Sequence, residues 1–203
     1  MTHGEAYDRV KRGLDVVGAG IGLVLLSPVI GAVAVAVRTK LGRPVIFRQH
    51  RPGKNGELFT LYKFRSMLFS EESDDVTTDE VRMTNFGRKL RSTSLDELPS
   101  LVNVLKGEMS FVGPRPLLID YVSLYTHEQW RRHEVLPGIT GLAQVNGRND
   151  ISWEEKFHND IEYVDHKSLK LDLSILYRTL ITVILRRGVS RDGHATTVPF
   201  AGK

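Results

Sequence analysis

The sequence contains no cysteine, and this absence excludes several kinds of chemistry. Without thiols the chain cannot form disulfides, thiolate zinc sites or a cysteine-based covalent intermediate. No two of its seven histidines are separated by one or three residues, so a zinc hydrolase is not expected. The Walker A loop, the Rossmann glycine fingerprint and the G-x-S-x-G nucleophile elbow are also missing.

The excess of charge is small. In 203 residues, 28 Lys and Arg face 24 Asp and Glu, which gives a net charge of +4. This length suits one domain or one domain with an appendage, and 41% hydrophobic content excludes collagen and bulk disorder. Residues 1–44 hold six bases and three acids, so the remainder is nearly neutral. We therefore expect no nucleic-acid partner and attribute the positive charge to contact with anionic lipid.

The sequence does contain a long apolar run. Residues 16–37 include no charge, and 16 of these 22 residues are hydrophobic, which is enough for a straight helix to cross a hydrocarbon core of about 30 Å. However, Ser27 and Pro28 lie near its middle, where proline favours a kink. Three bases flank each end, whereas a spanning helix usually has asymmetric flanks. Two readings stay open on these residues, a kinked span and a re-entrant hairpin, and both predict a membrane-bound protein.

The rest of the chain reads as a mixture of helices with one β-hairpin. Asn55-Gly56 lies between two β-rich runs, which is a strong turn signal. The last apolar segment is too short to span a membrane and is followed by two arginines, so it is either a core helix or one lying in the membrane interface. The expected elements are the hairpin over 44–67, an acidic loop or helix over 71–80, and helices near 85–91, 99–105, 117–134, 153–166 and 173–185.

Cations gather in the sequence between residues 63 and 115. Arg88 and Arg91 are three residues apart and would share one face of a helix. Arg115 stands between two prolines, which restrict the backbone and so aim its guanidinium at little entropic cost. Together with Lys63 these side chains could bind phosphate, although solvated faces and ion pairs are the commoner fate of basic residues.

Asp96-Glu97 is the candidate catalytic pair. A carboxylate is already ionised at neutral pH and needs no base to attack phosphorus, while Mg²⁺ prefers one or two carboxylates plus substrate oxygens. One structural reading competes with this one, because Ser94 and Glu97 match a helix capping box. If Pro99 instead takes the first helical position, the acids lie just outside the N-terminus, where they can divide roles as nucleophile and as metal ligand or proton handler.

A set of motifs runs along nearly the whole chain. They are Lys11-Arg12-x-x-Asp15, Ser27-Pro28, Ile46-Phe47-x-Gln49-x-Arg51-x-Gly53, Tyr62-Lys63-Phe64-Arg65-Ser66-Met67, Ser94-Leu95-Asp96-Glu97-Leu98-Pro99, residues 103–116 ending in Gly113-Pro114-Arg115-Pro116, and Pro137-Gly138-Ile139-Thr140-Gly141. These motifs resemble those of bacterial sugar transferases called monotopic phosphoglycosyl transferases. Within that family the tail 188–197, with Phe200 and Gly202, is most similar to small enzymes that transfer phospho-N,N'-diacetylbacillosamine in protein glycosylation.

The resemblance implies an α+β, mostly helical fold. Residues 1–44 would form a re-entrant membrane helix-break-helix, broken at Ser27-Pro28. Residues 45–203 would form a compact cytoplasmic catalytic domain with one small β-hairpin and interfacial amphipathic helices. The expected location is the cytoplasmic face of the bacterial inner membrane.

The resemblance also implies a reaction and its residues. A sugar 1-phosphate would pass from a UDP-sugar to undecaprenyl phosphate with release of UMP and with Mg²⁺ as cofactor. Asp96 would be the nucleophile and Glu97 the magnesium ligand. The phosphate-binding residues would be Lys63, Arg88, Arg91 and Arg115, and Asp172 would support the site, unless it is an ordinary helix cap.

Partners and alternatives complete the expectation. The partners would be the UDP-sugar, undecaprenyl phosphate, membrane lipids and downstream glycosyltransferases. The same chemistry with a galactose or N-acetylgalactosamine phosphate, for polysaccharide synthesis, is the alternative substrate. A membrane-anchored module that only binds nucleotide sugars is the non-enzymatic alternative.

Overall fold

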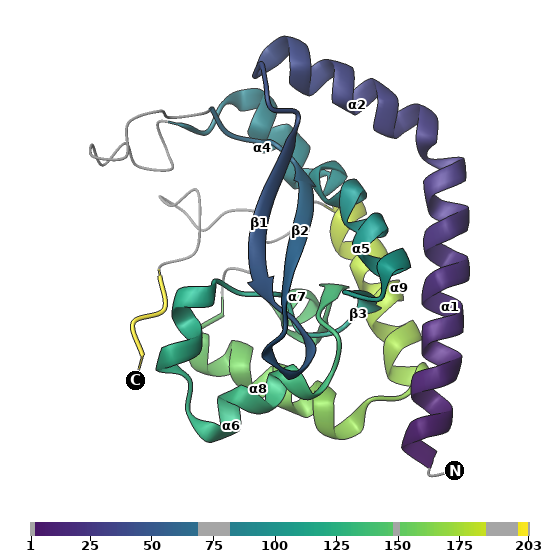
Figure 1. The fold of residues 1–203 in the computed structure, drawn as a ribbon, viewed down its shortest axis with the longest axis vertical. Coiled ribbons are helices and arrows are strands. Elements are labelled where there is room, and N and C mark those ends of the chain that lie inside the picture. The colour runs from purple at the N-terminus through teal and green to yellow at the C-terminus, as the bar shows by residue number, and fades with distance from the viewer. Residues whose placement is uncertain (1–2, 69–81, 148–150, 186–198, 203) are drawn as a thin grey trace.

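The computed structural model describes residues 3–68, 82–147, 151–185 and 199–202. The described chain is mostly helical, with two small two-stranded sheets (Figure 1). The longer helices are α1 (His3–Leu25), α2 (Ser27–Lys40), α4 (Asn85–Ser92), α5 (Leu101–Lys106), α7 (Leu142–Asn146), α8 (Trp153–His166) and α9 (Leu169–Leu185). The strands are β1 (Ile46–Pro52), β2 (Leu58–Phe64), β3 (Ser110–Val112) and β4 (Gly138–Thr140).

The apolar run forms two helices joined at a sharp bend. α1 ends at Leu25 and α2 begins at Ser27, with a bend of 64° between them. Pro28 lies in the first turn of α2, where its missing N–H costs nothing, and the Ser27 hydroxyl donates to the Val24 carbonyl at 2.8 Å. The break expected at Ser27-Pro28 is confirmed. Among the described residues no single helix is long and apolar enough to cross a membrane. The two helices of this bent pair, taken together, are long and apolar enough by length and composition.

α1 does not stand apart from the rest of the chain. Ala19 is fully buried and shares a core cluster with Leu61, Leu101 and Met109. Arg12 donates from Nη1 and Nη2 to the carbonyls of Val104 and Leu105, at 2.6 and 2.8 Å, and so caps the C-terminus of α5. The N-terminal helix therefore contributes to the same core that supports the strands.

The β-hairpin is confirmed. β1 pairs antiparallel with β2, in a register that sets Arg51 opposite Phe59 and Phe47 opposite Lys63. The turn between the strands is a short 3₁₀ helix, Lys54–Gly56, in which Asn55 and Gly56 have φ values of 57° and 79°. Asparagine and glycine tolerate this left-handed backbone best, which explains the signal in the sequence.

A second sheet was not expected from the sequence. β3 and β4 pair in parallel, with Ser110 opposite Gly138 and Val112 opposite Thr140. The two backbones approach so closely that a Cβ on Gly113 would lie 2.3 Å from the Leu136 carbonyl oxygen. Because these strands are only three residues long and widely separated in the chain, no local periodicity could reveal them.

The helix expected over 117–134 is wrong as a single element. The segment forms three short pieces, η3 (Ile119–Leu124), α6 (His127–Trp130) and η4 (Arg131–Glu134). Tyr125 is extended, and Thr126 starts α6 with a capping box in which its side chain accepts from the Gln129 N–H. A threonine cap thus overrides the apolar periodicity of the segment.

The helix expected at 173–185 is α9, which begins earlier, at Leu169. Neither a core helix nor an interfacial helix describes it fully. Ile175 is fully buried in the core, whereas the side chains of Leu173, Tyr177 and Leu180 are 60–67% exposed. One face of α9 therefore packs inward and the other presents apolar side chains. The acidic stretch 71–80, the arginines at 186 and 187 and the tail 188–197 lie outside the described residues.

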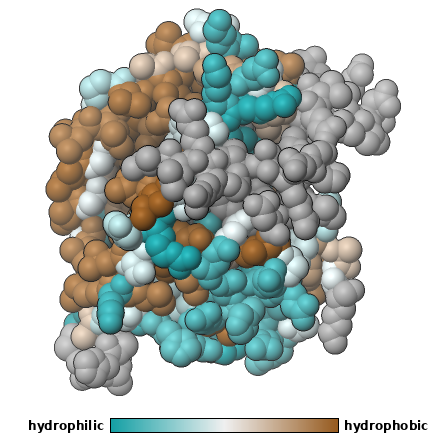
Figure 2. All heavy atoms as spheres, turned by 180° about the vertical axis from the view of Figure 1, so that it is seen from behind, coloured by the Kyte–Doolittle hydropathy of each residue, from teal (hydrophilic) through white to brown (hydrophobic). Residues whose placement is uncertain are grey.

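The surface is divided by polarity. In Figure 2 hydrophobic atoms gather along the edge where α1 lies, while the lower part of the same face is hydrophilic. The exposed apolar side chains of α1 include Leu14, Val17, Ile21, Val24 and Leu25. The fold class is thus confirmed as mostly helical with small sheets and a bent N-terminal helix pair, and the boundary expected at residue 44 stays a prediction.

Candidate active site

Glu97 lies at the centre of a cluster of opposite charges. Lys63 Nζ donates to Glu97 Oε1 at 2.7 Å, and Arg115 Nη2 donates to the same oxygen at 2.8 Å. Lys63 comes from β2 and Arg115 from the segment after β3, so residues 34 and 18 positions away from Glu97 meet on one atom. The structure therefore brings together three of the residues singled out in the sequence.

The carboxylate pair lies on a short 3₁₀ helix, η2 (Leu95–Ser100), that leads directly into α5. Ser94 has a left-handed backbone, with φ at 56°, and its side chain makes no cap bond, so the expected capping box does not form. Pro99 lies inside η2 and not at the first position of a helix, so the expected placement of the acids just outside a helix N-terminus is wrong. Asp96 and Glu97 occupy the first turn of η2.

Buried polar side chains lock β2 against this turn. The Ser100 hydroxyl donates to the Tyr62 carbonyl at 2.8 Å. Asn103, which is fully buried, accepts from the Tyr62 N–H at 3.1 Å and donates to the Thr60 carbonyl at 2.7 Å. Two of these hydrogen bonds are made by the backbone of Tyr62, the residue before Lys63. They therefore fix the position of the Lys63 backbone relative to the carboxylate pair.

Arg115 is held through its backbone. Its carbonyl accepts from Arg132 Nη2 at 2.6 Å, and the same guanidinium donates to Asp160 Oδ2 at 2.8 Å. Arg132 and Asp160 are both almost completely buried, with side-chain exposures of 2% and 6%. This buried ion pair, together with the flanking Pro114 and Pro116, fixes the position of the Arg115 backbone.

The two adjacent carboxylates have opposite electrostatic states. Burial, and then the Glu97 charge, raise the pKa of Asp96 to about 6. Burial alone would also raise the pKa of Glu97, but Arg115 and Lys63 together outweigh it and hold that pKa well below its usual range. Glu97 is therefore a permanent anion, while Asp96 is a basic carboxylate that is mostly ionised at pH 7.

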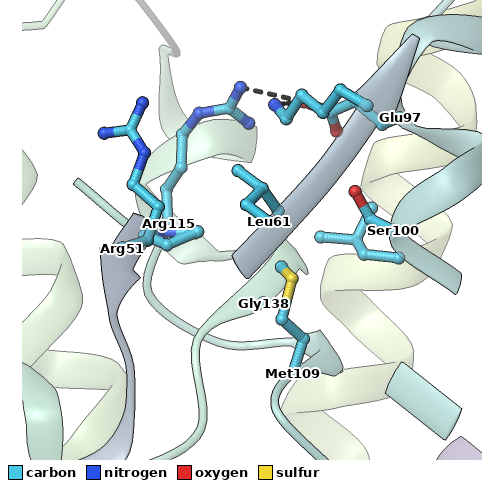
Figure 3. A pocket seen from close by; sticks show the side chains of 10 residues that line it. Arg51, Leu61, Glu97, Ser100, Met109, Arg115 and Gly138 are labelled. Atoms are coloured by element: carbon cyan, nitrogen blue, oxygen red, sulfur yellow. Dashed lines mark hydrogen bonds and ion pairs between the residues drawn. The ribbon is translucent and has the colours of Figure 1, made fainter. Parts of the chain in front are cut away.

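A pocket opens beside the cluster (Figure 3). It contains about 320 Å³ of empty space, part of it open to solvent. Lys63, Glu97 and Arg115 form its charged wall, and Leu61 and Met109 contribute an apolar floor. Its size, polarity and surplus of cations suit a phosphorylated ligand better than a neutral one.

The other two arginines expected at the site, Arg88 and Arg91, lie on α4. Arg91 is close enough to Asp96 for its charge to lower the pKa of that carboxyl. Arg88 is exposed on α4, with its guanidinium 3.5 Å from the Met83 carbonyl, and no described hydrogen bond joins it to the carboxylate pair. It stays a predicted phosphate ligand.

Asp172 belongs to a different cluster. Lys11 Nζ and Tyr7 Oη donate to its Oδ2 at 2.7 and 2.9 Å, and Tyr163 Oη donates to its Oδ1 at 2.8 Å. Asp172 thus ties α1 to α8 and α9, and it is neither a helix cap nor a contact of Glu97. Its supporting role at the site stays a prediction.

The carboxylate pair fits the expected magnesium ion. Both cations of the cluster bind Glu97 Oε1, which leaves Oε2 as the oxygen for a metal. Among the described residues no three His, Asp or Glu side chains gather into a metal cage. A magnesium ion here would take its other ligands from substrate phosphates and water, as this ion commonly does.

Sequence reasoning missed four residues of this site. Ser100, Asn103 and Arg132 position the charged side chains, and Arg51 lines the pocket next to Arg115. Asn103 and Arg51 lie within the family motifs quoted above, and this position could have marked them as site residues. Nothing local marked Arg132 and Ser100, because their partners are 17 and 38 residues away.

Comparison with known proteins identifies the family of this chain. The family model described as bacterial sugar transferase matches residues 6–186. An uncharacterised sugar transferase of Bacillus subtilis is 52% identical over 194 residues, covering 95% of this chain and 96% of that protein. A UDP-glucose:undecaprenyl-phosphate glucose-1-phosphate transferase of Klebsiella pneumoniae is 44% identical over 186 residues, covering 84% of this chain and 39% of its own length.

A third relative is the undecaprenyl-phosphate galactose phosphotransferase of Salmonella typhimurium, 38% identical over 197 residues. It is covered over 41% of its length and this chain over 88%, so the chain spans about two fifths of these two longer relatives. The family match extends over most of the chain and includes every residue of the charged cluster. This chain therefore belongs to the bacterial sugar transferase family.

Proposed function

We propose that this protein is a phosphoglycosyl transferase that moves a sugar 1-phosphate from a UDP-sugar to undecaprenyl phosphate and releases UMP. The observation that carries the proposal is the divided carboxylate pair, in which Glu97 is held ionised by Lys63 and Arg115 while the adjacent Asp96 keeps a raised pKa. Two relatives are named for transfers of this kind, with glucose and galactose phosphates. Their acceptor supports undecaprenyl phosphate for this chain.

The proposed reaction proceeds through a covalent intermediate on Asp96. One carboxylate oxygen attacks the β-phosphorus of the UDP-sugar, the bond to the bridging oxygen breaks, and UMP leaves with that electron pair. A phosphate oxygen of the lipid then attacks the same phosphorus, and the bond to Asp96 breaks. The products are the lipid diphosphosugar and the free carboxylate, so no water or redox partner is consumed.

The neighbouring residues stabilise charge and position. Lys63 and Arg115 neutralise the phosphate oxygens and, through Glu97, keep each other in place. Mg²⁺, held at Glu97, supplies further neutralisation of the phosphates and the leaving group. Because Asp96 lies within a largely buried turn, water has little access to the aspartyl phosphate.

The acceptor also needs a membrane site. The bent helix pair and the exposed apolar faces of α1 and α9 would hold the pocket at headgroup height, where the lipid phosphate lies. The pair would enter and leave on the cytoplasmic face. A water-soluble donor and a lipid acceptor could then meet without extraction of the lipid.

Two kinds of sugar are candidates. The tail motif favours N,N'-diacetylbacillosamine and a role in protein glycosylation. The names of the relatives favour glucose or galactose and polysaccharide synthesis. A panel of UDP-sugars assayed for UMP release in the presence of undecaprenyl phosphate distinguishes them.

The test of the chemistry is a pair of isosteric substitutions. Asp96→Asn should abolish UMP release and the phosphosugar adduct on the protein, since the amide is not a nucleophile. Glu97→Gln should lower the rate and its dependence on Mg²⁺. Asp120→Asn, which changes an exposed carboxylate on η3, is the control and should keep full activity. Full activity of Asp96→Asn would refute the covalent mechanism, and a wild-type protein that only binds UDP-sugars would favour the non-enzymatic alternative.

A further inference from the structure

Arg51 is a cation without a described counter-charge at the pocket. It lies near the end of β1, and its side chain lines the pocket together with Lys63 and Arg115. Its Nη2 donates to the neutral Gln49 Oε1 at 2.7 Å, while Nε is buried without a hydrogen-bond partner. No described carboxylate pairs with this guanidinium. An arginine in such surroundings is costly to the protein, because its charge is partly desolvated and uncompensated.

Other cations make this cost larger. Figure 3 shows Arg51 and Arg115 alongside each other, with Glu97 beyond Arg115. Burial, and then the charge of Arg115, lower the pKa of Arg51 to about 10. The same two causes lower the pKa of Lys63, although Glu97 partly opposes them. The pocket therefore has a surplus of positive charge at the end remote from the carboxylate pair, and an anion bound there would relieve it.

The strand register explains why Arg51 faces the pocket. Arg51 lies opposite Phe59 and Gln49 opposite Leu61, so both belong to the face of the hairpin that carries Leu61 and Lys63. Arg48, on the same strand, is paired with Tyr62 and lies on the other face, where it is exposed. The chain thus places one arginine of β1 in the pocket and another outside it.

The geometry of phosphoryl transfer assigns the anion. In a displacement at phosphorus the attacking and leaving oxygens lie on opposite sides of the phosphorus. With Asp96 as the attacking group, the leaving phosphate points away from the carboxylate pair, toward the end of the pocket that Arg51 lines. The two arginines and Lys63 would then bracket the diphosphate, with Arg51 at the leaving phosphate.

We propose that Arg51 binds the phosphate of the UMP leaving group. This inference rests on the proposed function. In the second displacement the lipid phosphate attacks from the side opposite Asp96 and so takes the position that the UMP phosphate has vacated. Arg51 should therefore affect the KM for the UDP-sugar, the affinity for UMP and the KM for undecaprenyl phosphate.

The test compares Arg51→Ala with Arg48→Ala as the matched control on the opposite face of β1. Arg51→Ala should raise the KM for the UDP-sugar and the inhibition constant of UMP about 10- to 100-fold, the loss expected for a charge-assisted hydrogen bond. Uridine, which lacks the phosphate, should inhibit both proteins equally. Arg51→Lys should recover part of the UMP affinity, because it keeps the charge but not the planar fork. Arg48→Ala should match wild type in all of these measurements.

Thermal unfolding supplies a readout independent of turnover. Without ligand, Arg51→Ala should unfold at or above the wild-type temperature, because the substitution removes an uncompensated cation. Added UMP should stabilise wild type and have a much smaller effect on the variant. Unchanged UMP binding in Arg51→Ala would overturn the inference while wild-type activity still upheld the proposed function. Absence of transfer by wild type would instead refute the proposed function itself.

Discussion

At the scale of single residues, the adjacent carboxylates show how environment gives two identical functional groups different tasks. Glu97 receives two cations on one oxygen and stays ionised at all ordinary pH values. Asp96 is buried beside that negative charge and binds its proton more tightly. A carboxylate with a raised pKa is the more basic of the two and thus the better nucleophile, provided that it is ionised.

A pH profile tests this division. With the pKa of Asp96 raised to about 6, the ionised fraction falls as the pH drops through 6, so kcat/KM for the UDP-sugar should fall about tenfold per pH unit below that value. Glu97 should add no step in this range, because its pKa lies below its usual value. Initial rates of UMP release between pH 5 and 8 provide the measurement, with Glu97→Gln as the comparison. A rate that stays constant down to pH 5 would contradict the assignment of Asp96 as the nucleophile.

At the scale of elements, the charged cluster joins side chains from three segments and depends on others behind them. η2 presents the carboxylates, β2 presents Lys63, and the segment after β3 presents Arg115. The buried pair of Arg132 and Asp160 connects η4 and α8 to the carbonyl of Arg115. Such a pair is a weak source of stability, but it is a strong constraint on position.

A double-mutant cycle separates these two roles of Arg132. Arg132→Met alone should destabilise the fold by about 3–5 kcal/mol, because it removes the hydrogen-bonded ion-pair partner of the buried Asp160. Adding Asp160→Leu should recover most of that loss. Activity should stay about tenfold low in the double variant, because Arg115 still lacks the donor to its carbonyl. Urea unfolding and UMP release are the two measurements, and activity that recovers together with stability would show that Arg132 has no positioning role.

At the scale of the whole molecule, the hydrophobic α1 edge and the hydrophilic remainder define an orientation (Figure 2). α1 packs one side into the core through Ala19 and exposes apolar side chains on the other. The hydrogen bonds from Lys11 and Tyr7 to Asp172 hold the start of α1 against α9. A membrane contact made by α1 and α9 would thus set the height of the pocket directly.

Topology can be tested with single cysteines, since the sequence has none of its own. Arg9→Cys and Lys40→Cys place thiols at exposed positions near the two ends of the bent pair. A membrane-impermeant maleimide applied to inverted inner-membrane vesicles should label both variants, and applied to intact spheroplasts should label neither. Labelling of the two thiols from opposite sides would show that the pair spans the bilayer. Detergent-solubilised protein, in which both thiols should react, is the control.

Local patterns account for much of this protein. The break at Ser27-Pro28, the hairpin with its Asn55-Gly56 turn and helix α8 follow from neighbouring residues, because caps, proline and turn chemistry act over a few positions. The adjacent acids and the basic residues were visible as candidates for the same reason. Local sequence patterns could not predict which charged side chains contact one another.

The tertiary structure decided the rest through contacts between residues far apart in the chain. The parallel pairing of β3 with β4 joins segments about 28 residues apart, as the paired Ser110 and Gly138 show. Long-range packing also gave Asp172 partners on α1 and put Arg51 beside Arg115 with no described carboxylate to balance it. The burial of a side chain and the charges around it are set by the tertiary structure. The sequence could therefore supply the chemical groups of this site, while their pKa values and partners depend on the fold.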